Sequence, residues 1–183
     1  MTHSTEPMPK RRTVLKIMHW TMVPLAIWFT LVQPDDVLAF GSGAFRFHSV
    51  LGLVFVTLAL VWTGFYLKNG LLSRRAPKLS PAGNKVHRAM HLTLVWGIFA
   101  VAFTGFLLGL TSSTLLFAGD IVPIAPPLGL PDANALIGKI HAAEFYILAA
   151  IMAFHASFHI WRHVRLRDNA LRIMVPKLLH RFL

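Results

Sequence analysis

Four long apolar runs constrain the fold of this 183-residue chain more than any other feature. They cover residues 14–33, 47–68, 90–110 and 135–161. A helix of about 20 apolar residues crosses the roughly 30 Å hydrocarbon core of a bilayer, and runs this long without strict alternation are not β-strands. The sequence therefore predicts an all-α, integral membrane four-helix bundle. We expect a single transmembrane domain over residues 1–183, of which residues 1–9 are disordered.

The composition agrees with a membrane protein and excludes several kinds of site. Hydrophobic residues make up 55% of the chain and charged residues 14%, whereas a soluble domain has about 25% charged residues. Cysteine is absent. Disulfides, thiolate metal sites, iron–sulfur clusters and covalent haem attachment through a CxxCH motif are therefore excluded.

The distribution of charge predicts the orientation of the bundle. The net charge is +11, from 18 Lys and Arg against 7 Asp and Glu. Sixteen of the cations fall on one side of four spans: four near the N-terminus, six in the second connection and six in the C-terminal tail. By the positive-inside rule, both termini lie in the cytoplasm. A nucleic-acid binder would not separate its charges by alternate loops, so we expect a lipid bilayer and no nucleic acid as partner.

Two of the ten histidines match in depth on the cytoplasmic side. His19 lies seven residues after Arg12, and His155 lies seven residues before Arg162. At a rise of 1.5 Å per residue, each is about 10 Å from its charge. Because polar residues inside a span are costly, histidines placed in this way are functional candidates.

A second pair matches on the outer side. His48 follows Arg46 by two residues, and His141 follows Lys139 by two. His141 and His155 share the last run and are fourteen residues apart, so they lie about 21 Å apart along the axis and within ~40° of one helix face.

Two imidazoles facing each other at each of two levels suit two six-coordinate haem b groups. A zinc ion would need four ligands at each level. We expect His19 with His155, and His48 with His141, to be axial ligands of haem iron. Arg46 and Lys139 on the outer side, and Lys16 and Arg162 on the inner side, are candidates to neutralise haem propionates.

Other interpretations remain open. The histidines could form interhelical hydrogen bonds, and His91 could replace His19 as a ligand. His87, His159 and His163 are expected to be interfacial or supporting residues. Gly52, one turn after His48, could leave room for a flat macrocycle or could simply serve helix packing.

Several motifs together resemble the bacterial cytochrome b561 family, which includes the b-type cytochrome subunits of membrane hydrogenases. The resemblance covers residues 11–177. The motifs are Met18-His19-Trp20, Phe47-His48-x-x-x-Gly52, His91-Leu92, Lys139-Ile140-His141 with His155, and Arg167-Asp168-Asn169-x-Leu171-Arg172-x-Met174-x-Pro176.

The resemblance implies a four-helix diheme electron carrier of the inner membrane, with the ligand pairs given above. It also implies a ubiquinone site near the cytoplasmic haem, and Lys78 matches a lysine beside that site in a stand-alone type that oxidises superoxide. Many members carry arginines where this chain has Trp62 and Thr63, so a propionate or quinone contact in that region is not expected here.

We therefore predict a diheme b-type cytochrome, an oxidoreductase that moves electrons between a periplasmic donor and the ubiquinone pool. Superoxide is one candidate donor, although the outer side keeps five of the seven acids and would repel it. The acidic outer side also suits a periplasmic electron-transfer protein. The alternative is a haem b membrane anchor that exchanges electrons with a partner dehydrogenase or c-type cytochrome. A transporter is disfavoured, because no inverted repeat is evident.

Overall fold

The computed structural model describes residues 11–71, 76–175 and 177–182. Its four long helices are α1 (Arg11–Leu31), α3 (Ser42–Asn69), α4 (Pro81–Thr111) and α5 (Pro131–Trp161). Each contains a segment long and apolar enough to cross a bilayer. The predicted all-α, four-helix membrane bundle is confirmed.

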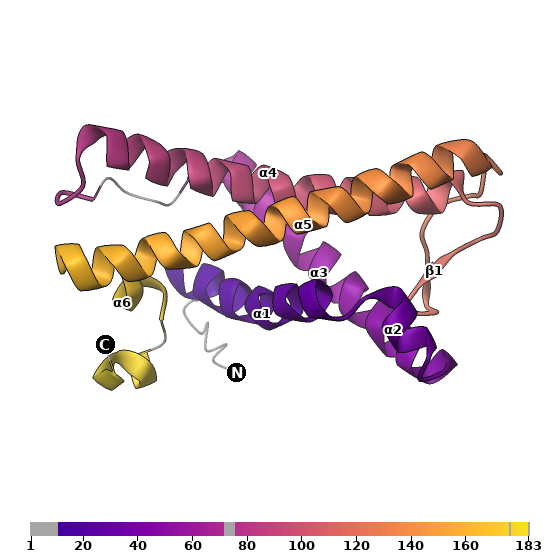
Figure 1. Cartoon of the computed structure of the whole chain (residues 1–183), viewed down its shortest axis with the longest axis horizontal. Helices are drawn as coiled ribbons and strands as arrows, with labels where there is room; N and C mark the ends of the chain where they lie inside the picture. Colours follow the sequence, from indigo (N-terminus) through magenta and orange to yellow (C-terminus); the bar gives the residue numbers. More distant parts are fainter. Residues whose placement is uncertain (1–10, 72–75, 176, 183) are drawn as a thin grey trace, which may run out of the picture.

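The long helices alternate in direction. In Figure 1, α1, α4 and α5 run along the long axis, whereas α3 lies behind them and crosses obliquely. Helices α4 and α5 pack against each other over much of their length. The start of α1, the end of α3, the start of α4 and the end of α5 therefore lie at one end of the bundle, which we call the basic end. The other end is called the opposite end.

All four long helices begin earlier than the apolar runs that predicted them. The extra turns in α4 and α5 begin with a proline, Pro81 and Pro131, a residue suited to the first helical position because its fixed φ is already helical. The Ser80 hydroxyl accepts a hydrogen bond from the Gly83 amide at 3.1 Å and caps α4. Hydropathy detects only the part of a helix that lies in lipid, so these polar first turns were not predicted.

Short elements join the long helices at the opposite end. Helix α2 (Pro34–Leu38) links α1 to α3, and strands β1 (Phe117–Ala118) and β2 (Val122–Pro123) form an antiparallel hairpin between α4 and α5. At its turn, Gly119 has a φ of +61°, a conformation open to glycine. The Gly119 amide donates to the Ser49 hydroxyl at 2.7 Å, and this bond ties the hairpin to α3.

Beyond α5, the chain folds back over the basic end. A π-helical turn η1 (Arg162–Leu166) is followed by α6 (Ala170–Met174) and a 3-10 helix η2 (Lys177–Phe182). The Lys16 ammonium of α1 donates to the Val175 carbonyl at 3.3 Å. This contact places the segment after α6 beside the first turns of α1.

The core lies where the four long helices meet. Its buried residues are Leu25, Ala26, Phe55, Ala59, Ile98, Val101, Ala102 and Leu148. A Cβ atom added to Gly97 of α4 would lie 3.0 Å from Leu148 Cδ1 of α5. Gly97 therefore lets these two helices approach closely, as small residues do in membrane bundles.

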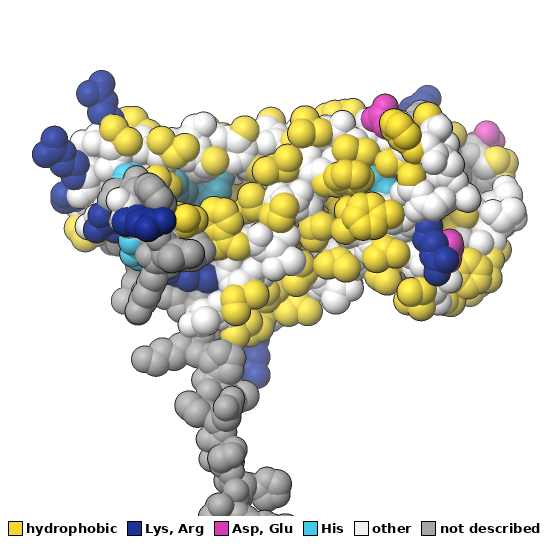
Figure 2. Space-filling model, turned by 90° about the horizontal axis from the view of Figure 1, so that it is seen from below, with side chains coloured by type: hydrophobic (Ala, Val, Ile, Leu, Met, Phe, Trp, Pro, Cys, Tyr) yellow, Lys and Arg dark blue, Asp and Glu magenta, His cyan; other side chains and the backbone are white. Residues whose placement is uncertain are grey.

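The outer surface of the bundle is apolar, as a lipid-facing surface must be. Large side chains such as Ile17, Phe103 and Ile147 are 62%, 50% and 60% exposed. Figure 2 shows apolar side chains across the middle of one face, with most of the visible Lys and Arg at the basic end. Asp and Glu, beside further Lys or Arg side chains, lie at the opposite end. An apolar belt between two charged ends fits a membrane-spanning protein.

Candidate functional site

Five histidines from three helices meet at the basic end. They are His19 of α1, His87 and His91 of α4, and His155 and His159 of α5. Neighbouring ring centroids are 4.5 to 6.4 Å apart. His19 and His155 were expected to face each other, and the structure brings them together.

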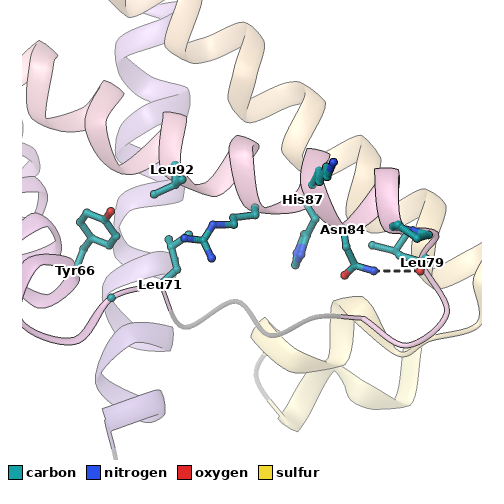
Figure 3. A pocket seen from close by; sticks show the side chains of 10 residues that line it. Tyr66, Leu71, Leu79, Asn84, His87 and Leu92 are labelled. Atoms are coloured by element: carbon teal, nitrogen blue, oxygen red, sulfur yellow. Dashed lines mark hydrogen bonds between the residues drawn. The ribbon is translucent and has the colours of Figure 1, made fainter.

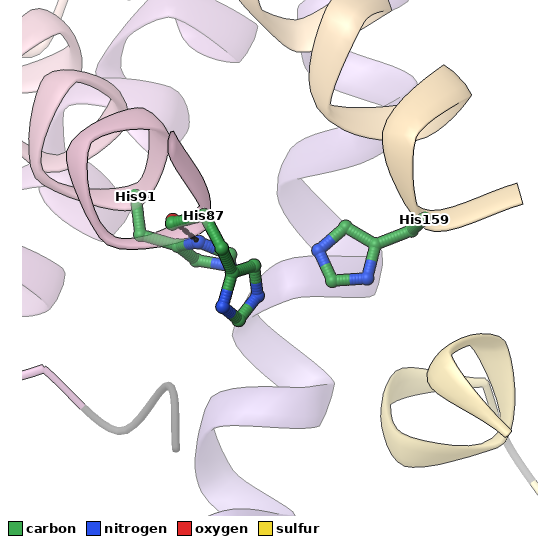
Figure 4. A group of neighbouring side chains, drawn as sticks. All are labelled: His87, His91 and His159. Atoms are coloured by element: carbon green, nitrogen blue, oxygen red, sulfur yellow. Dashed lines mark hydrogen bonds between the residues drawn. The ribbon is translucent and has the colours of Figure 1, made fainter. Parts of the chain in front are cut away.

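Sequence reasoning missed that His87 and His159 join this cluster. Each lies one turn from another member, His91 or His155, and residues four apart share a helix face. Because α4 and α5 are packed neighbours, the two His-x-x-x-His pairs face one another, as Figure 4 shows for three of the rings. The repeated spacing on two adjacent spans was the signal that could have found them.

The separation of His19 and His155 suits a metal between them. Their ring centroids are 6.4 Å apart. Two bonds of about 2.0 Å from a metal to imidazole nitrogens would place the centroids roughly 6 Å apart. Two imidazoles at this separation fit the axial ligands of a six-coordinate haem.

His91 stays an alternative ligand. Its Nδ1–H donates to the His87 carbonyl at 2.7 Å, so the lone pair is on Nε2, as ligation through that atom requires. However, its ring centroid is only 5.0 Å from that of His155, less than the roughly 6 Å that a metal between two imidazoles needs. A ligating nitrogen of His91 lies within 4.8 Å of those of His87 and His159.

Arg162 is engaged within the chain. Its guanidinium donates to Asp168 Oδ2 at 2.8 and 2.6 Å and to His87 Nε2 at 3.1 Å. The two charged side chains are 4% and 5% exposed. Arg167 and Asn169, with φ of 48° and 57°, form the turn that returns Asp168 to Arg162. The Arg-Asp-Asn motif therefore serves this buried ion pair, and Asp168 already balances the charge expected to neutralise a propionate.

A cavity of about 610 Å³ opens beside the histidine cluster. It lies between the end of α3 and the start of α4, and its lining includes Tyr66, Leu71, His87 and Leu92 (Figure 3). A volume of this size with mostly apolar walls is typical of small-molecule sites. His87 therefore belongs both to the cavity and to the cluster.

Lys78 is exposed and does not line this cavity. Its ammonium donates to the Arg167 carbonyl at 2.9 Å. The neighbouring Leu79 is part of the cavity wall. Lys78 thus lies close to the cavity in sequence, while its side chain reaches toward the segment that follows η1.

At the opposite end, His141 of α5 is bonded to Thr104, which in turn is bonded to Glu144. His141 Nδ1 lies 2.8 Å from the Thr104 hydroxyl of α4, and that hydroxyl donates to Glu144 Oε2, also at 2.8 Å. A Cβ atom added to Gly105 would lie 3.4 Å from His141 Cε1. The ring therefore packs directly against α4.

His48 of α3 has a different environment. The Trp28 indole N–H donates to His48 Nδ1 at 3.1 Å, and the Phe29 ring packs on it at 4.9 Å. Over the part of the chain that the structure describes, no ring contact joins His48 to His141. The second predicted pair is therefore less closely assembled than the first.

The other predicted residues of this end lie around its rim. Arg46 forms an exposed ion pair with Asp120 at 3.5 Å, and Lys139 is exposed. A Cβ atom added to Gly52 would meet Phe29 Cζ at 3.8 Å, an ordinary contact distance. Gly52 therefore shows no close approach that would require a glycine.

One known protein family matches this chain. The family model of prokaryotic cytochrome b561 matches residues 10–177. No curated protein matches the chain. The family implies a b-type haem protein that transfers electrons in a bacterial membrane, which agrees with four apolar spans and paired imidazoles at the basic end. Since the match covers nearly the whole sequence, this chain belongs to the prokaryotic cytochrome b561 family.

Proposed function

We propose that the chain holds two haem b groups and carries electrons across the bacterial inner membrane, between a periplasmic donor and the ubiquinone pool. His19 and His155 would hold one haem, and His48 and His141 the other. A bound haem supplies one-electron exchange at its iron. The observation that carries the proposal is the pair at the basic end, with ring centroids 6.4 Å apart.

The basic end is proposed to face the cytoplasm. Most of the cations of the chain belong to this end, and the positive-inside rule assigns such loops to the cytoplasmic side. With this orientation, α5 presents His155 toward the cytoplasm and His141 toward the periplasm. The two haems would then lie one above the other across the bilayer.

Ubiquinone is proposed to bind in the cavity beside the cytoplasmic haem. The apolar walls, with Leu71 and Leu92, suit a lipid-soluble ring, and the cavity reaches His87 of the histidine cluster. His87 and the Tyr66 hydroxyl offer hydrogen bonds to quinone oxygens. Lys78, next to the lining residue Leu79, is proposed to act at the mouth of this cavity.

A second candidate function is that of a membrane anchor for a partner dehydrogenase or c-type cytochrome. It is favoured by the surface of the opposite end, where Phe40, Ile121 and Leu128 are 84%, 68% and 58% exposed. Arg46, the cation nearest to His48 in the sequence, is paired with Asp120, so it offers little attraction to a superoxide anion. A protein donor therefore suits this surface better than superoxide does.

Haem content and ligand substitution test the ligand assignment. Purified protein should contain two haems per chain, and His141→Ala and His155→Ala should each retain one. His91→Ala is the matched control and should retain both. A protein that stays colourless after haem supplementation would contradict the proposal. Loss of haem from His91→Ala would transfer the ligand role from His19 to His91.

Electron transfer tests the donor and the acceptor. Protein reduced with dithionite should be reoxidised by a soluble ubiquinone analogue, and His87→Leu should slow that step without changing the haem content. Oxidised protein should be reduced only slowly by a superoxide source. Rapid reduction by superoxide would favour the stand-alone enzyme over the anchor subunit.

A further inference from the structure

The Thr104 hydroxyl bridges His141 and a carboxyl group inside a membrane span. Thr104 Oγ1 is 2.8 Å from His141 Nδ1 and 2.8 Å from Glu144 Oε2. Thr104 is 8% exposed, and Glu144 follows His141 by one helical turn on α5. An ionisable group at such a position is costly and is by default a functional candidate.

The single hydroxyl proton fixes the direction of the bridge. Thr104 Oγ1 also lies 3.0 Å from the Ala100 carbonyl and 3.2 Å from the Val101 carbonyl. A carboxylate is the stronger acceptor and is closer, so the proton points to Glu144. The hydroxyl oxygen is then free to accept the Nδ1–H of His141. We call this chain of two hydrogen bonds the Glu144 relay.

The relay selects one tautomer of the imidazole. With its proton on Nδ1, His141 keeps a lone pair on Nε2, as an iron ligand must. The ring has little freedom to turn, since it also packs against α4 beside Gly105. Donation from a ligating histidine toward a carboxylate makes the imidazole more basic.

His48 shows that this arrangement is specific to His141. An indole N–H can only donate, so His48 Nδ1 accepts from Trp28 and carries the lone pair. In neutral His48 the proton is therefore on Nε2, so binding iron through that atom requires the Trp28 contact to break and the proton to move to Nδ1. His141 already has the tautomer that ligation through Nε2 requires. Of these two histidines, only His141 is linked to a carboxyl group.

We propose that Thr104 and Glu144 are positioning residues for the haem at the opposite end. They hold His141 with Nε2 available to iron, and the carboxylate lowers the reduction potential of that haem by making its ligand more basic. This inference rests on the proposed role of His141 as an iron ligand. Glu144 also lines an apolar groove between α4 and α5, so its charge is weakly screened there.

Redox titration of the holoprotein tests the relay. Glu144→Gln and Thr104→Val should raise the midpoint of one haem, with an expected tenfold change in the ferrous-to-ferric ratio at fixed potential, or 59 mV for one electron. The other haem should not shift. Thr104→Ser keeps the hydroxyl and should restore the original midpoint. Thr93→Val, which removes an exposed hydroxyl from the same helix, is the matched control.

The outcomes separate the relay from the ligand assignment. Two bound haems with unchanged midpoints in Glu144→Gln and Thr104→Val would overturn the relay and leave the ligands in place. If His141→Ala retains both haems, the ligand assignment fails instead. Loss of one haem from Thr104→Val supports positioning if Thr104→Ser restores it, and overturns the relay if it does not.

Discussion

Removing the charge of Asp168 should destabilise the basic end strongly. Asp168→Asn leaves the Arg162 guanidinium almost fully buried without a counter-charge, because both side chains are at most 5% exposed. Breaking one partner of a buried ion pair costs about 3–5 kcal/mol. Asparagine keeps one acceptor oxygen, so we expect about 3 kcal/mol, the lower end of that range. The Arg162 contact with His87 should weaken as well.

The assay is thermal unfolding in detergent, followed by helical signal, with the exposed pair at the opposite end as control. Asp120→Asn makes the same chemical change in a pair whose side chains are 60% and 63% exposed, where about 0–1 kcal/mol is expected. Asp168→Asn combined with Arg162→Met removes both charges and should recover part of the stability. Equal stability of Asp168→Asn and Asp120→Asn would refute this account of the buried pair.

Three further predictions concern packing, the second histidine and orientation. Leu148→Ala removes a side chain that is 1% exposed and should cost about 2–5 kcal/mol; an unchanged unfolding temperature would contradict close packing at Gly97. Trp28→Phe removes the donor to His48 Nδ1 and should leave haem content unchanged, measured by pyridine haemochrome, whereas haem loss would assign Trp28 a supporting role. A C-terminal fluorescent protein that folds only in the cytoplasm should be bright, and a dark fusion would reverse the proposed orientation.

The sequence predicted the four spans well, because hydropathy over about 20 residues responds directly to the bilayer. It also predicted that His19 and His155 face each other, since depth along two spans follows from residue count. It did not predict the β1–β2 hairpin, whose two-residue strands are too short to produce a pattern. Helix bounds were placed too far inward wherever polar turns continued a helix beyond the lipid.

The hydrogen-bond and ion-pair partners of side chains were harder to predict than the depth of the histidines along their helices. The Arg162–Asp168 pair depends on a turn with positive φ at Arg167 and Asn169, and no periodicity reveals such a turn. Glu144 was predicted only as one acid among several on the outer side. Its bond to the Thr104 hydroxyl depends on which face of α4 is turned toward α5. Sequence spacing alone does not predict that orientation.

The two ends of α5 differ in the charge that surrounds their histidines. At the basic end, the buried carboxylate of Asp168 is neutralised by Arg162. At the opposite end, Glu144 is bonded to the Thr104 hydroxyl, and no Lys or Arg pairs with it among the residues that the structure describes. An uncompensated negative charge near His141 would favour ferric iron, so the haem proposed for the opposite end should have the lower potential. Electrons would then pass from the opposite end to the basic end, from the proposed donor toward the proposed quinone. Midpoints measured separately in His155→Ala and His141→Ala should show this order, and the reverse order would contradict the proposed direction.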